Sequence, residues 1–237
     1  MAFKKKVNIS IVMPTCNRYE IALQNVANLL RQKQQQMEVI VCDDSDISYK
    51  TVHGKEFCRK INMMKASYIY CARFRADGTK EYGLARARNS GILESKGDVV
   101  VFLDDRITPV REDTICIMHK ELMQRPRKTW VYGNKGSNKK VFVENFSAVR
   151  RADIIDAGMF CERIDQYGGA TREIIARMTA QGFSFLYVTA AHARAICPSS
   201  GWDNKPRQIK AMEAVLEKMW GDNFADHFPK LFRNSST

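Results

Sequence analysis

The sequence lacks three features that would place it in a specialised class of protein. No apolar run approaches the ~18 residues of a membrane-spanning helix, so we expect no transmembrane segment. The basic start of the chain is followed by polar Asn8 and Ser10 and then by Pro14, which excludes the apolar core of a signal peptide. The seven cysteines form no C-x-x-C pair, so neither a zinc knuckle nor a disulfide framework is indicated. We therefore expect reduced thiols and a cytoplasmic protein.

Acidic residues are scarce relative to basic ones. The chain has 38 Lys and Arg against 26 Asp and Glu, a formal net charge of +12. A surface with this excess attracts polyanions such as nucleic acid, anionic lipid headgroups or acidic glycans. The same excess is equally compatible with charge that only keeps a protein in solution. Charge therefore suggests a class of partner but carries no information about the fold.

Apolar runs and amphipathic stretches alternate along the chain, as they do in α/β proteins. Buried strands are predicted over 7–13, 37–42 and 99–103, and helices over 21–34 and 84–94. Weaker patterns predict a strand over 66–71, a helix over 171–181, a strand over 183–189 and a last helix over 207–220. This alternation predicts a mostly parallel, twisted central sheet with helices on both faces. No linker interrupts it, so we expect a single domain over residues 1–237.

Two of the predicted strands run directly into paired carboxylates. Asp43 and Asp44 follow the second strand, and Asp104 and Asp105 follow the strand over 99–103. The carboxyl ends of parallel strands meet at one edge of a sheet, where ligands bind in such folds. There Mg²⁺ or Mn²⁺ can bridge carboxylates and phosphate oxygens, and a further carboxylate can accept a hydrogen bond from a pyrimidine N–H. The pattern predicts a pocket for a nucleoside diphosphate with a group attached to it.

Four segments, in the right order, resemble the nucleotide-sugar glycosyltransferases of family 2, which have the GT-A (Rossmann-like) fold. Residues 11–18 are similar to the family's opening strand and P-T-x-N-R turn, and residues 38–45 to its E-V-I-V-V-D-D-G-S element. Residues 83–91 resemble its G-x-x-x-A-R-N-x-G helix, and residues 102–105 its F-L-D-x-D strand end. The resemblance implies one GT-A domain in which residues 1–110 bind a nucleoside-diphosphate sugar, with a UDP-sugar favoured. Residues 111–237, including a C-terminal helix, would bind an acceptor whose hydroxyl receives the hexose or pentose.

The resemblance also implies roles for individual residues at the donor site. The implied donor-binding set is Pro14, Thr15, Asn17, Arg18, Asp43, Asp44, Arg88, Asn89, Asp104 and Arg106. One of Asp43 and Asp44 would hold the uracil ring. Asp104 and Asp105 would be catalytic and would hold Mn²⁺ or Mg²⁺, with His192 as a downstream metal ligand.

The second half departs from the family where its catalytic base is expected. Residues 167–169 resemble the start of a Y-G-G-E-D segment, but Ala170 and Thr171 stand in place of the acidic pair. In inverting relatives the aspartate of that pair deprotonates the acceptor hydroxyl, which threonine cannot do. Glu173 and Asp165 are the candidate substitutes, and inversion is the default expectation.

The metal motif departs from the family as well, because Arg106 occupies the position of the final acid in D-x-D. Two readings follow. In the favoured one, Asp104 and Asp105 suffice for the metal, since metal-ion help to a leaving diphosphate is the commoner arrangement. In the other, Arg106 itself supplies the positive charge on the diphosphate and partly replaces the ion.

The acceptor is predicted from charge. Over residues 120–151, nine basic residues stand against Glu121 and Glu144, which leaves a net charge of +7. The candidate acceptor-binding residues are Lys135, Lys139, Lys140, Arg150, Arg151, Tyr167, Gly168, Gly169 and Thr171. A basic groove beside a donor site would suit DNA that carries a hydroxymethylated pyrimidine, and this is the favoured hypothesis.

Two alternatives to the DNA acceptor stay open. The first is a cell-envelope glycosyltransferase that builds a polysaccharide or a lipid-linked glycan and is held at the membrane surface by the same basic residues. The second is a catalytically degenerate fold that serves as a nucleic-acid-binding module. Fold analogy cannot choose among acceptors, and the sequence leaves the oligomeric state open.

Overall fold

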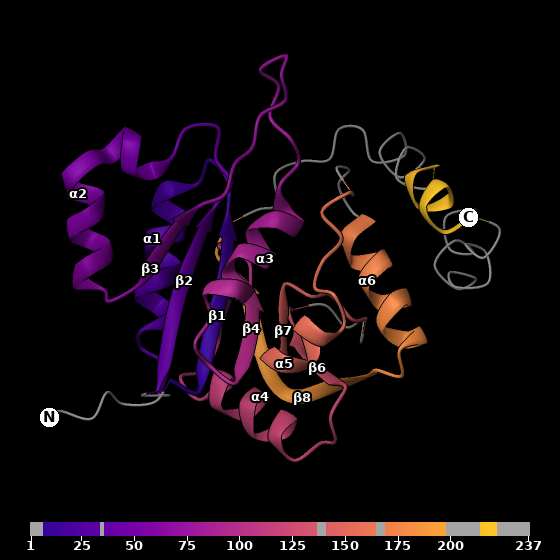
Figure 1. Cartoon of the computed structure of the whole chain (residues 1–237). Coiled ribbons are helices and arrows are strands. Elements are labelled where there is room, and N and C mark those ends of the chain that lie inside the picture. The colour runs from indigo at the N-terminus through magenta and orange to yellow at the C-terminus, as the bar shows by residue number, and fades with distance from the viewer. Residues whose placement is uncertain (1–6, 34–35, 137–140, 165–168, 198–213, 222–237) are drawn as a thin grey trace, which may run out of the picture.

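The computed structural model describes residues 7–33, 36–136, 141–164, 169–197 and 214–221, whose strands form one eight-stranded sheet (Figure 1). Its strand order is β3-β2-β1-β4-β7-β6-β8-β5. Four strands lie parallel: β1 (Ile9–Thr15), β2 (Met37–Asp43), β3 (Ser67–Tyr70) and β4 (Val99–Leu103). The other four are β5 (Ile107–Pro109), β6 (Thr129–Asn134), β7 (Phe146–Arg150) and β8 (Ser184–Ala195). β6 and β8 are also parallel to each other, whereas β7 runs antiparallel to β4 and β6, and β5 antiparallel to β8. The sheet is therefore mixed and mostly parallel, as expected.

Helices cover both faces of the sheet, which confirms the predicted layers. One face packs against α1 (Tyr19–Leu29), α2 (Tyr49–Met63) and α4 (Thr114–Met123). The other packs against α3 (Leu84–Glu94), α5 (Arg151–Asp156) and α6 (Gly169–Ala180). In β1, Ile11 and Met13 face the first layer and Val12 faces the second. Because successive side chains point to opposite faces and both faces are covered, a central strand such as β1 is buried along its whole length and is mostly apolar.

The predicted elements of the first half match the structure closely, and α3 and β4 have the predicted bounds. The first helix begins earlier than predicted and ends at Leu29. β8 extends beyond the predicted 183–189 because it pairs first with β6 and then with β5. Of the predicted last helix, 214–220 is helical, and 207–213 lies outside the described residues. Helices α2, α4 and α5 lie where no helix is predicted.

The strand directions define the edge of the sheet that matters for function. β1, β2 and β4 end side by side, since Thr15 pairs with Asp43 and Val12 pairs with Phe102. The segment between β3 and α3 projects beyond this edge (Figure 1) and is closed by a bridge between Phe74 and Lys80. Across the described ranges, none of the helices is both long enough and apolar enough to span a membrane.

Candidate functional site

A pocket of about 640 Å³ opens at the edge where β1, β2 and β4 end. Its lining comes from Pro14, Thr15, Cys16, Asn17, Arg18, Asp44, Lys80, Glu81, Tyr82, Leu84, Ala87, Asp104 and Arg106. The parallel strands bring residues far apart in the chain to one place, as the sequence predicted. Pockets that hold small molecules and cofactors commonly have volumes of about 300–1,000 Å³. The pocket is therefore large enough for a nucleotide with a group attached.

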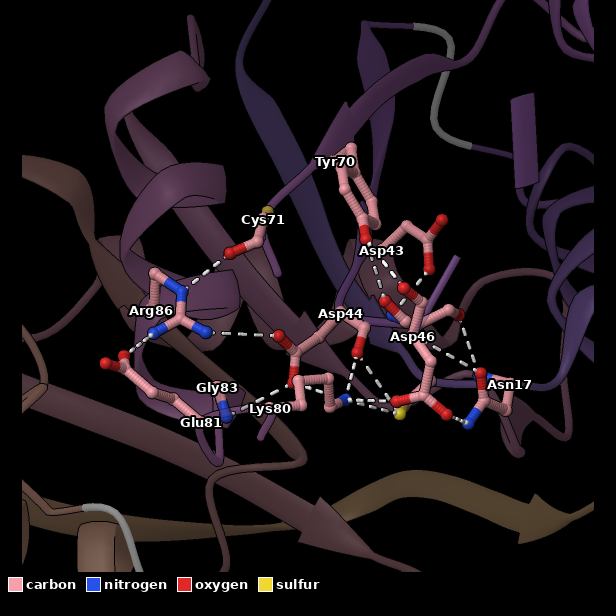
Figure 2. Close-up of polar contacts among 12 residues, drawn as sticks. Asn17, Asp43, Asp44, Asp46, Tyr70, Cys71, Lys80, Glu81, Gly83 and Arg86 are labelled. Atoms are coloured by element: carbon pink, nitrogen blue, oxygen red, sulfur yellow. Dashed lines mark hydrogen bonds and ion pairs between the residues drawn. The ribbon is translucent and has the colours of Figure 1, made fainter. Parts of the chain in front are cut away.

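The carboxylate of Asp44 is held by several donors at the pocket wall (Figure 2). The Arg86 guanidinium lies 3.3 Å from its Oδ1, and the Gly83 N–H and the Lys80 ammonium lie 3.1 Å and 3.4 Å from its Oδ2. Only glycine fits at position 83, because a Cβ there would lie 2.1 Å from Asp44 Oδ1. Burial raises the pKa of Asp44, and Lys80 and Arg86 oppose that rise. Asp44 is thus a positioned hydrogen-bond acceptor.

Asp43, the neighbouring residue, is fully buried and does not line the pocket. Its carboxylate accepts hydrogen bonds from the Tyr68 hydroxyl at 2.6 Å and from the backbone N–H groups of Tyr49 and Ser45 at 2.9 Å each. These bonds hold the turn that leads into α2. Of the two aspartates that the sequence left open as base-binding residues, only Asp44 faces the pocket.

Asp105 is also enclosed. Its side chain is fully buried, and its Oδ2 accepts hydrogen bonds from the Thr15 hydroxyl at 2.7 Å and from Arg18 Nε at 2.9 Å. Its Oδ1 is buried without a hydrogen-bond partner among the described residues. Burial raises the pKa of Asp105 to about 6, although Arg18 opposes the rise. Thr15 and Arg18 line the pocket, so Asp105 supports two lining residues without lining it.

Asp104 lines the pocket and belongs to a network of paired charges. Its Oδ1 lies 3.4 Å from Arg88 Nη2, and its Oδ2 accepts a hydrogen bond from the Asn145 amide at 2.9 Å. Arg88 Nη1 lies 2.7 Å from Glu144 Oε1, and the Thr171 hydroxyl donates to Glu144 Oε2 at 2.6 Å. Burial would raise the pKa of Glu144, but Arg88 and Thr171 hold it below its ordinary value. The network joins α3 and β4 to the beginning of α6.

Two further cations lie at this network. Arg106 lines the pocket next to Asp104. The Lys135 ammonium donates a hydrogen bond to Asn145 Oδ1. Burial lowers the pKa of Lys135, and Arg106 and Arg88 act in the same direction, whereas Asp104 and Glu144 oppose them. Lys135, a predicted acceptor-site residue, therefore lies at the pocket edge that carries Asp104.

The side chains at this edge do not fit the predicted metal site. In the part of the chain that the structure describes, no three His, Cys, Asp or Glu side chains are grouped so that they could hold an ion. Asp105 is enclosed by Thr15 and Arg18, and Asp104 is paired with Arg88. His192 is exposed on β8 and does not line the pocket. Mg²⁺ and Mn²⁺ bind through one or two carboxylates together with phosphate oxygens. Of the three predicted ligands only Asp104 lines the pocket, and its carboxylate is already paired with Arg88.

Asn89 and Glu173 hold the fold together and do not line the pocket. The Asn89 amide exchanges hydrogen bonds of 2.9 Å with the backbone of Phe160, which ties α3 to the turn after α5. Glu173 is 2% exposed and lies 2.5 Å from Arg177 Nε on the same helix. Arg177 in turn donates to the carbonyls of Ala157 and Met159. A carboxylate engaged in this way is not free to act as a base, so Glu173 does not replace the missing acidic pair.

Arg150 and Arg151 lie at the opposite edge of the sheet from the pocket. β7 is antiparallel to β4, and the register pairs Arg150 with Val99, the first residue of β4. The Arg150 guanidinium donates to the carbonyls of Leu122, Arg125 and Pro126, and that of Arg151 to the carbonyls of Ile92 and Leu93. The described part of the basic segment therefore forms no continuous groove beside the pocket. Lys139, Lys140, Asp165, Tyr167 and Gly168 lie outside the described residues, and Gly169 begins α6.

Sequence reasoning missed several residues of the site. Glu144 pairs with Arg88. The pocket-lining residues that were not predicted are Cys16, Lys80, Glu81, Tyr82, Leu84 and Ala87. The signal for Glu144 was available, since it is one of two acids in a strongly basic segment. Nothing in the sequence marks Lys80, because it reaches Asp44 only through the projecting segment before α3.

Comparisons with known proteins agree with this geometry. The family model described as Glycosyl transferase family 2 matches residues 10–157. A putative colanic acid biosynthesis glycosyl transferase of Escherichia coli, WcaA, is 27% identical over 128 residues. An uncharacterized glycosyltransferase of Rickettsia bellii is 31% identical over 103 residues. These matches cover 53% and 42% of this chain but only 42% and 13% of the two relatives.

Solved structures share the fold at low sequence identity. A mannosyltransferase of Pyrobaculum calidifontis, in complex with GDP-Man and Mn²⁺, has a TM-score of 0.64 at 14% identity over 89% of this chain and 64% of its own. GalNAc-T7, with UDP, GalNAc and Mn²⁺, has a TM-score of 0.69 at 15% identity over 95% of this chain and 50% of its own. Both neighbours are glycosyltransferases of the GT-A fold. The family match spans more than half of the chain and includes the strand ends that build the pocket, so the chain belongs to glycosyl transferase family 2.

Proposed function

We propose that this protein transfers a sugar from a nucleoside diphosphate, with UDP the favoured carrier, to a hydroxyl group of its acceptor. The observation that carries the proposal is a single pocket that holds Asp44 together with Asp104 and Arg106. In the reaction, the bond between the anomeric carbon and the diphosphate oxygen breaks, and its electron pair stays on that oxygen. The acceptor oxygen bonds to the carbon and loses its proton to a base.

Different lining residues of the pocket would bind different parts of the donor. Asp44 accepts an N–H of the nucleobase, and Arg18 and Arg106 lie where a charged diphosphate would be favoured. We propose a single domain in which residues 1–110 supply most of this donor site and residues 111–237 form the acceptor side. Seven free cysteines support a reducing cytoplasmic location.

Ala170 and Thr171 stand in place of the acidic pair, so a different group must act as the catalytic base, and the anomeric outcome of the transfer has to be determined separately. Thr171 donates to Glu144, and Glu173 is paired with Arg177, so neither offers a free carboxylate. We keep Asp165 as the candidate base and inversion as the default outcome. The anomeric configuration of the product, read by NMR, decides between inversion and retention.

Substituting Asp44→Asn should weaken the binding of UDP by about tenfold, because the loss of a charge-assisted hydrogen bond costs about 1.5 kcal/mol or more. Isothermal titration of both proteins with UDP, and in parallel with GDP, measures the effect and reports which base is preferred. The matched control is Asp113→Asn, an aspartate that pairs with Arg111 outside the pocket. Equal UDP affinity in the Asp44 variant and the wild type would refute the assignment of Asp44 to the nucleobase.

We propose a carbohydrate hydroxyl, in place of the DNA that the sequence favoured, as the acceptor. Arg150 and Arg151, which were to line a DNA groove, have their guanidinium groups bound to backbone carbonyls at the far edge of the sheet. A relative of the chain is described by its name as a putative enzyme of colanic acid biosynthesis. We therefore favour transfer to a cell-envelope glycan, with the reaction taking place at the membrane surface.

Duplex DNA that contains 5-hydroxymethylcytosine should neither accelerate UDP release from UDP-sugars nor bind with a steep salt dependence. Binding by electrostatic contacts to several phosphates would weaken by about 10³-fold or more between 50 mM and 200 mM salt. The measurements are UDP release with and without the DNA, and fluorescence anisotropy at the two salt concentrations. DNA-stimulated release would restore the DNA acceptor, and DNA binding without any nucleotide binding would select the degenerate module.

A further inference from the structure

The carboxylates around the pocket are already neutralised by arginines. Asp105 is paired with Arg18 at 2.9 Å, and Arg88 lies 3.4 Å from Asp104 and 2.7 Å from Glu144. The Asp105 and Glu144 side chains are 0% and 5% exposed. A divalent ion would have to displace arginines that compensate buried charges, which leaves those charges unpaired. The observed pairing therefore disfavours a metal ion at this place.

Arg106 and Lys135 remain as cations at the same place. Arg106 lines the pocket, and among the described residues no carboxylate lies within ion-pair distance of its guanidinium. Lys135 contacts the oxygen of Asn145, whose amide nitrogen contacts Asp104. At this place Asp104 and Glu144 carry two negative charges. Arg88, Arg106 and Lys135 carry three positive charges, so the net charge is +1. A region of net positive charge attracts a diphosphate and repels a divalent cation.

We propose that Arg106, assisted by Lys135, binds the donor diphosphate directly and takes the place of a divalent metal ion, so that donor binding needs no metal. The inference rests on the proposed function and deepens it. It differs from what the neighbours contain, since two of them are complexes with Mn²⁺.

The chemistry of the two side chains suits this task. A guanidinium is planar, stays charged and can donate two parallel hydrogen bonds to phosphate oxygens, whereas an ammonium acts as a compact point charge. As the sugar departs, the diphosphate oxygen that keeps the electron pair gains negative charge. Donors already in place stabilise that charge without further reorganisation. Arg106, which stands at the position of the final acid in D-x-D, thus stabilises the negative charge that develops on the leaving diphosphate.

The test is isothermal titration with UDP and GDP, each in EDTA and each with Mn²⁺. We expect the preferred nucleotide to bind with affinities that agree within about twofold in the two conditions. Arg106→Ala should weaken UDP binding by about tenfold or more, which is the usual scale for one lost charge-assisted contact. It should leave the affinity for uridine, which has no diphosphate, unchanged. Arg106→Lys, which keeps the charge, should recover part of the loss.

Arg31→Ala is the matched control, since Arg31 is an exposed arginine that follows α1 and does not line the pocket. Melting temperatures identify variants that fail to fold. Binding that disappears in EDTA and returns with Mn²⁺ would overturn the inference and leave the proposed function standing. An equal loss of UDP and uridine affinity in Arg106→Ala would also overturn it. If neither nucleotide binds in any condition, the proposed function fails, and the inference fails with it.

Discussion

Arg88→Gln should lower the free energy of unfolding by about 3–5 kcal/mol, because removing one partner of a buried ion pair leaves uncompensated charge. The Arg88 side chain is 1% exposed and lies 2.7 Å from Glu144, which is 5% exposed. The guanidinium also lies 3.4 Å from Asp104 and over the Phe160 ring, 5.2 Å from its centroid. Glutamine fills part of the space but cannot neutralise either carboxylate. Urea unfolding of the two proteins measures the difference.

The loss of unfolding free energy in Arg88→Gln should increase as the pH rises. In the wild type the pKa of Glu144 is lowered, so its contribution to stability is present above pH ~4.5 and is lost as the pH falls through the lowered pKa. In Arg88→Gln burial should raise that pKa instead, so ionisation of Glu144 costs stability as the pH rises. The deficit of the variant should therefore be larger at pH 8 than at pH 4.

Arg125→Gln is the control for this substitution. Arg125 forms a surface pair with Glu121 at 3.3 Å, and both side chains are well exposed. A pair of that kind contributes at most about 0.5 kcal/mol. A deficit in Arg88→Gln no larger than that of the control, or one independent of pH, would mean that the Arg88–Glu144 pair does not stabilise the fold.

Asp105→Asn should remove a pH-dependent loss of stability. The folded pKa of Asp105 is about 6 and the ordinary value is 3.8. A carboxyl group whose folded pKa is raised contributes stability below the unfolded pKa and loses it as the pH rises through the folded pKa. Between pH 4 and pH 7 this group should cost the wild type about 2 kcal/mol. Asparagine has nearly the same shape and does not ionise, so the variant should gain in stability relative to the wild type by that amount.

Urea unfolding of both proteins between pH 4 and pH 7 gives the two curves, and their difference isolates Asp105. Asp46→Asn serves as the control, because Asp46 is an exposed aspartate at the same edge with a side chain that is 61% exposed. Parallel curves for Asp105→Asn and the wild type would show that Asp105 is already ionised throughout. Its pairing with Arg18 would then outweigh the cost of burial.

The pattern of apolar runs was enough to place the pocket. The strands that end at Thr15, Asp43 and Leu103 are mostly apolar, and their alternation with helices predicts parallel pairing. Parallel pairing in turn brings Asp44 and Asp104 to one edge. The fold class and the position of the donor site follow from these local signals. Helices α2 and α4 were not predicted, although α4 has a stripe of Ile115, Met118 and Leu122 that packs against the sheet.

Which of two neighbouring acids faces the pocket could be decided only by tertiary structure. Asp104 lines the pocket, whereas Asp105 is enclosed by Thr15 and Arg18. Consecutive side chains that leave a strand point in different directions, and their environments come from segments distant in the chain. The same holds for Asp43 and Asp44.

The positions of the charges in the basic segment, residues 120–151, were also decided only by the tertiary structure. Its composition predicted one basic groove, but β7 is antiparallel to β4 and carries Arg150 to the edge opposite the pocket, while Lys135 stays at the pocket edge. Composition records how many charges a segment has, and only strand direction decides where they lie. Membership in glycosyl transferase family 2, by contrast, could be predicted from the order of the motifs along the chain. The pairing of every acid at the pocket required the folded arrangement, because each partner comes from a different element.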